Sequence, residues 1–162
     1  MRKKEVAAKL NKASILFFLL SSLIILMLPF ADSETNSALS IASGVIFWAG
    51  LILGIVCYYL SYKNIKDVQE YQTLAKRNRI GALAPGSTRE GMIVDILFVP
   101  TFVISILGTF VMLIPSPVML VSMWIALVTL YGHFVLNGRV YKFLHMGKER
   151  PSGRKTSKST TS

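Results

Sequence analysis

A stretch in the middle of the chain, GALAPGST at positions 81–88, nearly matches the phosphate-binding loop G-x-x-x-x-G-K-[ST]. Both glycines and the final threonine fall in register, but Ser87 stands where the motif has the lysine that neutralises phosphate charge. Pro85 also removes one backbone amide that could bind phosphate. We therefore interpret the stretch as a Gly/Pro turn, in which Ser87 and Thr88 precede the start of a helix.

A second set of chemically active residues lies near the ends of two apolar runs. Asp95 and His133 are the titratable acid and base that fall there, with Asn137 and Arg139 close behind in sequence. Counting helical rise in both directions from Ser116 brings Asp95, His133 and Asn137 to a similar depth. A carboxylate at the bilayer centre costs about 3 kcal/mol or more, so burial requires a partner. The cluster Asp95, His133, Asn137 and Arg139 predicts either a polar contact between two helices or a proton or ion relay; a third alternative leaves Asp95 solvated at the interface.

Motifs of the common enzyme and metal sites are missing from the sequence. It contains no HExxH and no GxSxG motif. Cys57 is the single cysteine, so there is also no cysteine pair. We therefore predict no catalytic residue, no metal site and no cofactor. A membrane enzyme acting on lipid, with Asp95 and His133 as acid and base, is the weakest alternative.

The elements that must position these residues are apolar runs interrupted by blocks of charge. The chain has 162 residues, of which 52% are hydrophobic. Since about 20 apolar residues form a helix that crosses a hydrocarbon core of about 30 Å, each long run predicts a transmembrane helix. We predict an all-α integral membrane protein whose four spans cover residues of about 13–30, 39–61, 92–114 and 118–137. Pro115 and Pro117 separate the last two spans, which predicts a tight hairpin.

The basic residues predict the topology. All eighteen Lys and Arg fall in the segments 1–12, 62–91 and 139–162, and none falls in the two remaining connections. Because positive residues stay on the cytoplasmic side, both termini and the 62–91 loop are predicted to lie inside. The chain then divides into a basic N-terminus (1–12), a transmembrane domain (13–138) and a basic tail (139–162).

Three segments need a separate interpretation. The first apolar run follows a basic start, but its length and lack of a cleavage site favour a retained signal-anchor helix. Residues 63–80 have apolar residues at helical spacing, which predicts an amphipathic extension of the second span into the cytosol. The tail has no apolar periodicity from about residue 148, and we predict that it is disordered there.

The second span contains GLILG, the small-xxx-small spacing that lets two helices approach closely. The same helical face continues in both directions as a stripe of small residues. This face either packs inside the four-helix bundle or contacts another subunit. Its members are Ser43, Gly50, Gly54, Cys57 and Ser61.

These features favour a non-enzymatic accessory or assembly subunit of a membrane, which packs against partner helices. The alternative is a small transporter or a channel-forming homo-oligomer, with Asp95 and His133 near its inner mouth. We expect a plasma-membrane location, a membrane-protein partner or a second copy of the chain, and anionic lipid headgroups at the basic segments. Nucleic acid is not an expected partner.

Overall fold

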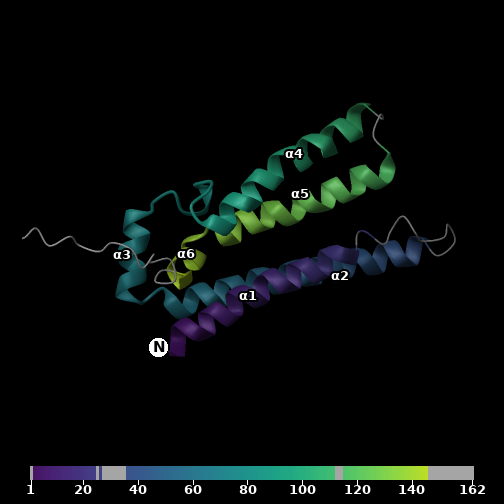
Figure 1. Cartoon of the computed structure of the whole chain (residues 1–162). Coiled ribbons are helices and arrows are strands. Elements are labelled where there is room, and N and C mark those ends of the chain that lie inside the picture. Colours follow the sequence, from purple (N-terminus) through teal and green to yellow (C-terminus); the bar gives the residue numbers. More distant parts are fainter. Residues whose placement is uncertain (1, 25, 27–35, 112–114, 146–162) are drawn as a thin grey trace, which may run out of the picture.

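The computed structural model describes residues 2–24, 26, 36–111 and 115–145 (Figure 1). Within these residues the chain is helical and forms no β-strand. The elements are the helices α1 (Arg2–Leu23), α2 (Asn36–Ile65), α3 (Gln69–Arg77), α4 (Arg89–Val111), α5 (Ser116–Leu136) and α6 (Arg139–His145), with a short 3-10 turn, η2 (Gly81–Leu83), between α3 and α4.

Four of these helices are long and apolar enough to cross a membrane, which indicates a membrane-embedded protein. They coincide with the predicted spans in number and order. The second, third and fourth helices agree with the predicted boundaries to within a few residues. The link at residues 112–114 lies outside the described residues, so the tight hairpin stays a prediction. The spanning segments are Lys3–Leu23, Ala38–Ile65, Arg89–Phe110 and Pro117–Leu136.

The first span differs from the prediction, because α1 begins at Arg2 instead of near residue 13. Hydropathy places the start of a span where charge ends, but a helix continues as long as its residues favour helix and one face is buried. Ala7, Asn11, Ser14 and Phe18 recur at helical spacing and are all buried. The predicted end of this span, residues 27–30, lies outside the described part of the chain.

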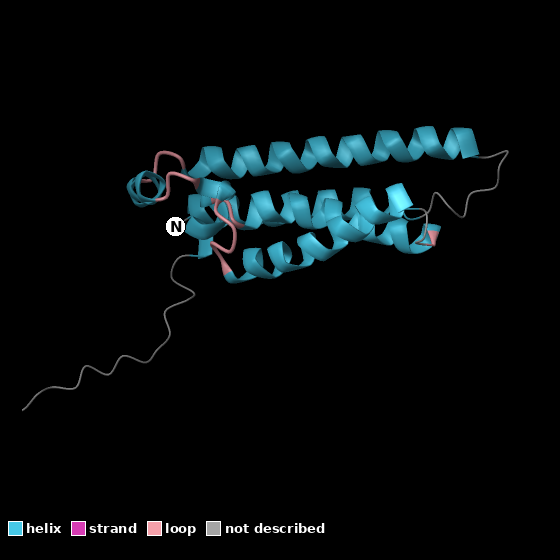
Figure 2. Cartoon of the chain, turned by 90° about the horizontal axis from the view of Figure 1, so that it is seen from above, coloured by secondary structure: helices cyan, strands magenta, loops and turns pink. Residues whose placement is uncertain are grey.

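The long helices form two pairs that extend from a common end (Figures 1 and 2). Helix α1 lies along α2, and α4 lies along α5. The two pairs meet through α1 and α5. There the rings of Phe18 and Tyr131 stack with centroids 4.0 Å apart, and the Trp124 indole Nε1 donates a hydrogen bond of 3.1 Å to the Ser22 hydroxyl.

Burial in the spans is inverted relative to a water-soluble bundle. Small and hydroxyl-bearing residues such as Ser14, Ser22 and Ser61 are fully buried, whereas most large apolar side chains, Phe18 excepted, face outward. Trp48 is 61% exposed and Phe110 is 81% exposed. In lipid, tight contact between small residues holds helices together, while large apolar side chains cost nothing on the outside. The packing therefore agrees with a membrane as the surrounding solvent.

The predicted amphipathic extension of the second span is wrong as one continuous helix. Helix α2 ends at Ile65, and a new helix, α3, begins at Gln69. Val68 between them has an extended backbone, with φ −76° and ψ 123°, so the chain changes direction there. The turn carries Tyr71 and Leu74 toward the end of the bundle, where both are buried.

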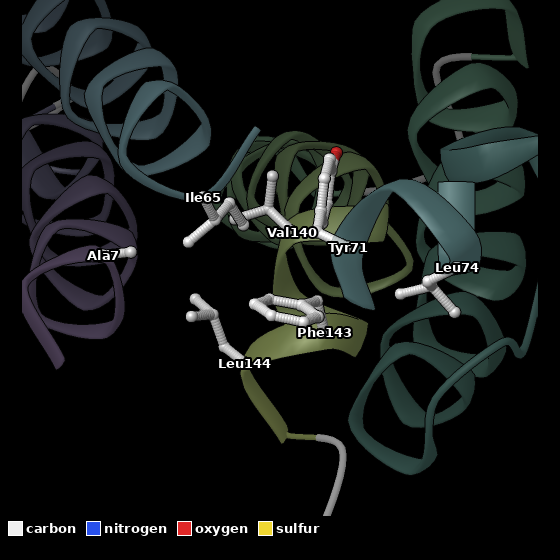
Figure 3. Packing of buried hydrophobic residues seen from close by; sticks show 7 residues of the cluster. All are labelled: Ala7, Ile65, Tyr71, Leu74, Val140, Phe143 and Leu144. Atoms are coloured by element: carbon white, nitrogen blue, oxygen red, sulfur yellow. The ribbon is translucent and has the colours of Figure 1, made fainter. Parts of the chain in front are cut away.

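At the common end of the two helix pairs, buried apolar side chains form a terminal cluster that joins α1, α2, α3 and α6 (Figure 3). The ring of Tyr71 meets that of Phe143 edge-on, with centroids 5.5 Å apart. Sequence analysis assigned residues from 139 onward to a basic tail, but residues 139–145 form α6 and bury four side chains. The predicted disorder from about residue 148 concerns residues outside the described part. The terminal cluster is Ala7, Ile65, Tyr71, Leu74, Val140, Phe143 and Leu144.

Candidate functional site

The structure brings Asp95, His133 and Asn137 together where α4 begins and α5 ends. Asp95 lies on the second turn of α4, and the two others lie one turn apart on α5. The His133 Nδ1 is 2.6 Å from the Asp95 Oδ1. The Asn137 amide donates to both carboxylate oxygens, over 3.2 Å to Oδ1 and 3.1 Å to Oδ2. Asn137 is fully buried, so these bonds satisfy a side chain that has no access to solvent.

The loop before α4 completes this arrangement. The Gly86 amide donates to the Asp95 Oδ2 over 2.7 Å, and the Ser87 amide donates to the Asn137 Oδ1 over 3.0 Å. The Ser87 hydroxyl also donates to the Asn137 carbonyl oxygen over 3.0 Å. We call Asp95, His133, Asn137, Gly86 and Ser87 the Asp95 cluster.

The stretch that resembles a phosphate-binding loop is therefore a turn held by a carboxylate. Gly86 has φ 61°, a left-handed conformation that glycine adopts without strain. Its amide, which a phosphate would need, already binds Asp95. The Thr88 hydroxyl accepts a hydrogen bond of 3.0 Å from the Gly91 amide, which makes Thr88 the cap of α4. The same hydroxyl donates to the Leu136 carbonyl over 3.1 Å and so ties the cap to α5.

Close approach of the two helices at this point depends on Gly91. A Cβ atom on Gly91 would lie 2.0 Å from the Asn137 Oδ1, a distance that no side chain tolerates. Sequence analysis missed Gly86 and Gly91 as members of the site. Gly86 lies in the stretch that it singled out and Gly91 follows that stretch by three residues, but nothing local in the sequence indicates that residue 137 is their neighbour.

Arg139 lies outside the Asp95 cluster. Its Nε donates to the Asn78 carbonyl over 2.8 Å, and its Nη2 donates to the Arg79 carbonyl. In the part of the chain that the structure describes, the ion-pair partner of Asp95 is His133, not Arg139. The guanidinium instead fixes the chain between α3 and η2, where Gly81 approaches it closely with φ 62°.

The small-residue face of α2 packs against other helices of the same chain, mainly α1. A Cβ on Gly50 would lie 2.1 Å from the Ser21 Cβ, and one on Gly54 would lie 2.8 Å from the Tyr131 hydroxyl. The Ser61 hydroxyl donates to the Ala7 carbonyl over 2.7 Å. Ser43, at the other end of the face, is also buried, and Cys57 is partly buried.

Comparison with known proteins gives no relative for this chain. No family model matches it, and no curated protein or solved structure is significantly similar.

The chemistry open to the Asp95 cluster follows from the contacts of its acid and base. The side chains of His133 and Asp95 are 21% and 17% exposed, so both are largely shielded from solvent. A neutral His133 donates its Nδ1 proton to Asp95 and leaves its Nε2 as an acceptor. Each carboxylate oxygen of Asp95 accepts from two groups of the same chain. Within the described residues, no group of three or more metal-ligating side chains comes together.

Proposed function

We propose that the chain is a non-enzymatic accessory or assembly subunit of a membrane, which packs against partner helices through the outer face of α4. The observation that carries the proposal is the contrast between the satisfied Asp95 cluster and this outer face. Asp95 binds Gly86, His133 and Asn137, which ties two helices and a loop together. Because these polar groups are already paired within the chain, a partner protein would be bound by exposed apolar side chains.

Helix α4 offers that surface over its whole length. Among the long helices its main contact is α5, so most of its circumference faces away from the protein. The exposed side chains are large and include Phe102 and Phe110. Aromatic and branched side chains of this size are the usual anchors of helix packing and of interface hot spots. The large exposed apolar residues of α4 are Met92, Ile93, Ile96, Leu97, Val99, Phe102, Val103, Ile106, Leu107 and Phe110.

Site-specific photocrosslinking in intact cells tests this proposal. A photoreactive residue at position 102, which is 45% exposed on α4, should give a discrete adduct with a membrane protein. The same residue at position 126, which is 7% exposed on α5, is the matched control and should give no intermolecular adduct. Adducts with lipid alone at position 102 would refute the accessory function.

The alternative function is a small transporter or channel-forming homo-oligomer with Asp95 and His133 near its inner mouth. The observation that favours it is the short contact of 2.6 Å between a carboxylate and an imidazole, a pair that can exchange a proton. A photocrosslinked adduct of twice the chain's mass at position 102, together with ion flux in liposomes, would select this function.

The proposed topology places both termini and the 62–91 loop in the cytoplasm. It is supported by the meeting of α3, α6 and the start of α1 at one end of the molecule (Figure 1). The described parts of the basic segments, which the positive-inside rule assigns to one side, thus lie at one end of the bundle. Cysteines placed at Ser37 and Ser157 in a Cys57→Ser background should be labelled from opposite sides of the membrane. Labelling of both in intact cells by an impermeant reagent would show that the topology is wrong.

A further inference from the structure

A cavity of about 320 Å³ lies between the first turns of α1 and the end of α6. Lys4, Asn11 and Lys12 line it from α1, and Leu144 and His145 line it from α6. The cavity is separate from the Asp95 cluster and shares no residue with it. Because α1 and α6 come from opposite ends of the sequence, this site exists only in the folded chain.

The cavity carries positive charge. Glu5 also lines it, but its carboxylate is paired with the Lys9 ammonium at 3.1 Å, outside the cavity. Lys4 and Lys12 form no ion pair among the described residues. The Lys4 Nζ lies 4.9 Å from the centre of the Phe143 ring, which orients its ammonium beside α6. The cavity is therefore suited to an anion.

Asn11 adds a second requirement. This side chain is only 1% exposed, and its Oδ1 is buried without a hydrogen-bond partner. A buried acceptor left unpaired is costly, so a ligand that supplies a donor gains affinity here. Such a ligand would place its anionic part beside the lining lysines and a hydroxyl beside Asn11.

The ring of His145 is fixed beside these groups. Its Nδ1 is 3.0 Å from the Tyr141 carbonyl oxygen, and it stacks on the Tyr141 ring with centroids 3.9 Å apart. A neutral His145 donates from Nδ1 to this carbonyl, which leaves Nε2 as an acceptor. A second hydroxyl of the ligand therefore has an acceptor in the same cavity.

The position of the cavity along α1 favours a lipid over a soluble molecule. Lys12 is the last charged residue before the uncharged run 13–31. In a membrane this boundary lies at the level of the headgroups. We propose that the cavity binds the headgroup of an anionic phospholipid that carries free hydroxyls, such as phosphatidylglycerol. This inference rests on the proposed membrane topology. It assigns a class of lipid to one site formed by the basic N-terminal segment.

Binding of defined lipids to the purified full chain in detergent, measured by native mass spectrometry, tests the proposal. The lipids are phosphatidylglycerol, phosphatidylmethanol and phosphatidylcholine with identical acyl chains. The first two carry the same charge, but only phosphatidylglycerol has headgroup hydroxyls. The wild-type chain should prefer phosphatidylglycerol to phosphatidylmethanol several-fold, and both to phosphatidylcholine.

Two double variants with the same net charge test whether the lipid binds in this cavity. Lys4→Gln with Lys12→Gln should weaken phosphatidylglycerol binding at least about tenfold, given the contribution of each basic residue near a membrane surface. Lys3→Gln with Lys63→Gln removes the same charge outside the cavity and should change binding less than about twofold. Equal loss in both pairs would overturn the proposal, because binding would then depend on overall charge.

Asn11→Ala should abolish the preference for phosphatidylglycerol over phosphatidylmethanol while the chain still prefers both to phosphatidylcholine. An unchanged preference would overturn the role of Asn11. Displacement of the lipid by millimolar glycerol 1-phosphate would overturn the lipid assignment and indicate a soluble phosphate ester instead. These measurements use the isolated chain, so they can fail while the crosslinking of α4 succeeds, and the reverse.

Discussion

The two helix pairs achieve close contact in different ways. Between α1 and α2, contact is spread along the helices through Gly50 and Gly54 and through the hydrogen bond from Ser61 to the Ala7 carbonyl. Between α4 and α5, polar contact is concentrated at one end, in the Asp95 cluster. Distributed packing of small residues depends on shape, whereas a terminal polar cluster depends on hydrogen bonding. The stability of the α1–α2 pair should therefore depend mainly on side-chain volume, and that of the α4–α5 pair mainly on side-chain polarity.

The largest effect is expected for Gly50→Leu. A side chain here collides with Ser21, whose Cβ would lie 2.1 Å away, and α1 and α2 must separate to admit it. We expect a loss of about 3 kcal/mol or more in stability, at the upper end of overpacking effects. Thermal unfolding in detergent measures it. Gly44→Leu on the same helix is the control, because a Cβ at Gly44 meets nothing within 4 Å. Equal stability of the two variants would show that α1 and α2 do not pack this way.

A smaller effect is expected for the Asp95 cluster. Asp95→Leu leaves His133, Asn137 and the Gly86 amide without an acceptor and should cost about 1–2 kcal/mol, the scale of polar contacts between membrane helices. Asp95→Asn retains a hydrogen-bonding side chain and should cost less. Thermal stability and growth complementation are measured together. An Asn variant that is fully stable but inactive would contradict the structural role of Asp95 and favour proton transfer.

The smallest effect compares two buried serines of α2. Ser61→Ala removes a hydrogen bond to α1 and should cost about 0.6 kcal/mol, the average for such contacts in a membrane protein. Ser43→Ala removes only a bond to the Ser40 carbonyl of its own helix, so little stability should be lost. Matched unfolding curves in detergent distinguish the two. If Ser43→Ala is the more damaging, the hydrogen bonds between α1 and α2 do not stabilise the pair.

The same contrast shows what sequence can predict. The four apolar helices follow from hydropathy, because lipid leaves the backbone no other way to satisfy its hydrogen bonds. Likewise, the depth count brought Asp95, His133 and Asn137 to one level, since helical rise is fixed. The direction of the Arg139 side chain and the packing of the loop against Asn137 were not predictable, because they depend on contacts between residues 61 and 50 positions apart in sequence.

Short elements outside the spans escaped prediction for a related reason. Helix α6 has only seven residues, and its basic residues resemble those of a solvated tail. Its apolar residues are buried only because Tyr71 and Ile65, which are distant in sequence, pack in the same cluster. The break at Val68 was missed because the apolar spacing of α2 continues into α3. Periodicity alone therefore predicts one continuous helix.

The hydrogen bonds from the Ser87 amide and hydroxyl to Asn137 set an order of events during biosynthesis. The two residues are 50 positions apart, so the loop before α4 leaves the ribosome well before its partner is made. At about 5–20 residues per second the delay is about 3–10 s. During this interval Asp95 has neither His133 nor Asn137 beside it, and α4 must be held by the insertion machinery or by lipid alone. Insertion of α4 is therefore the step at which the nascent chain is most exposed to quality control.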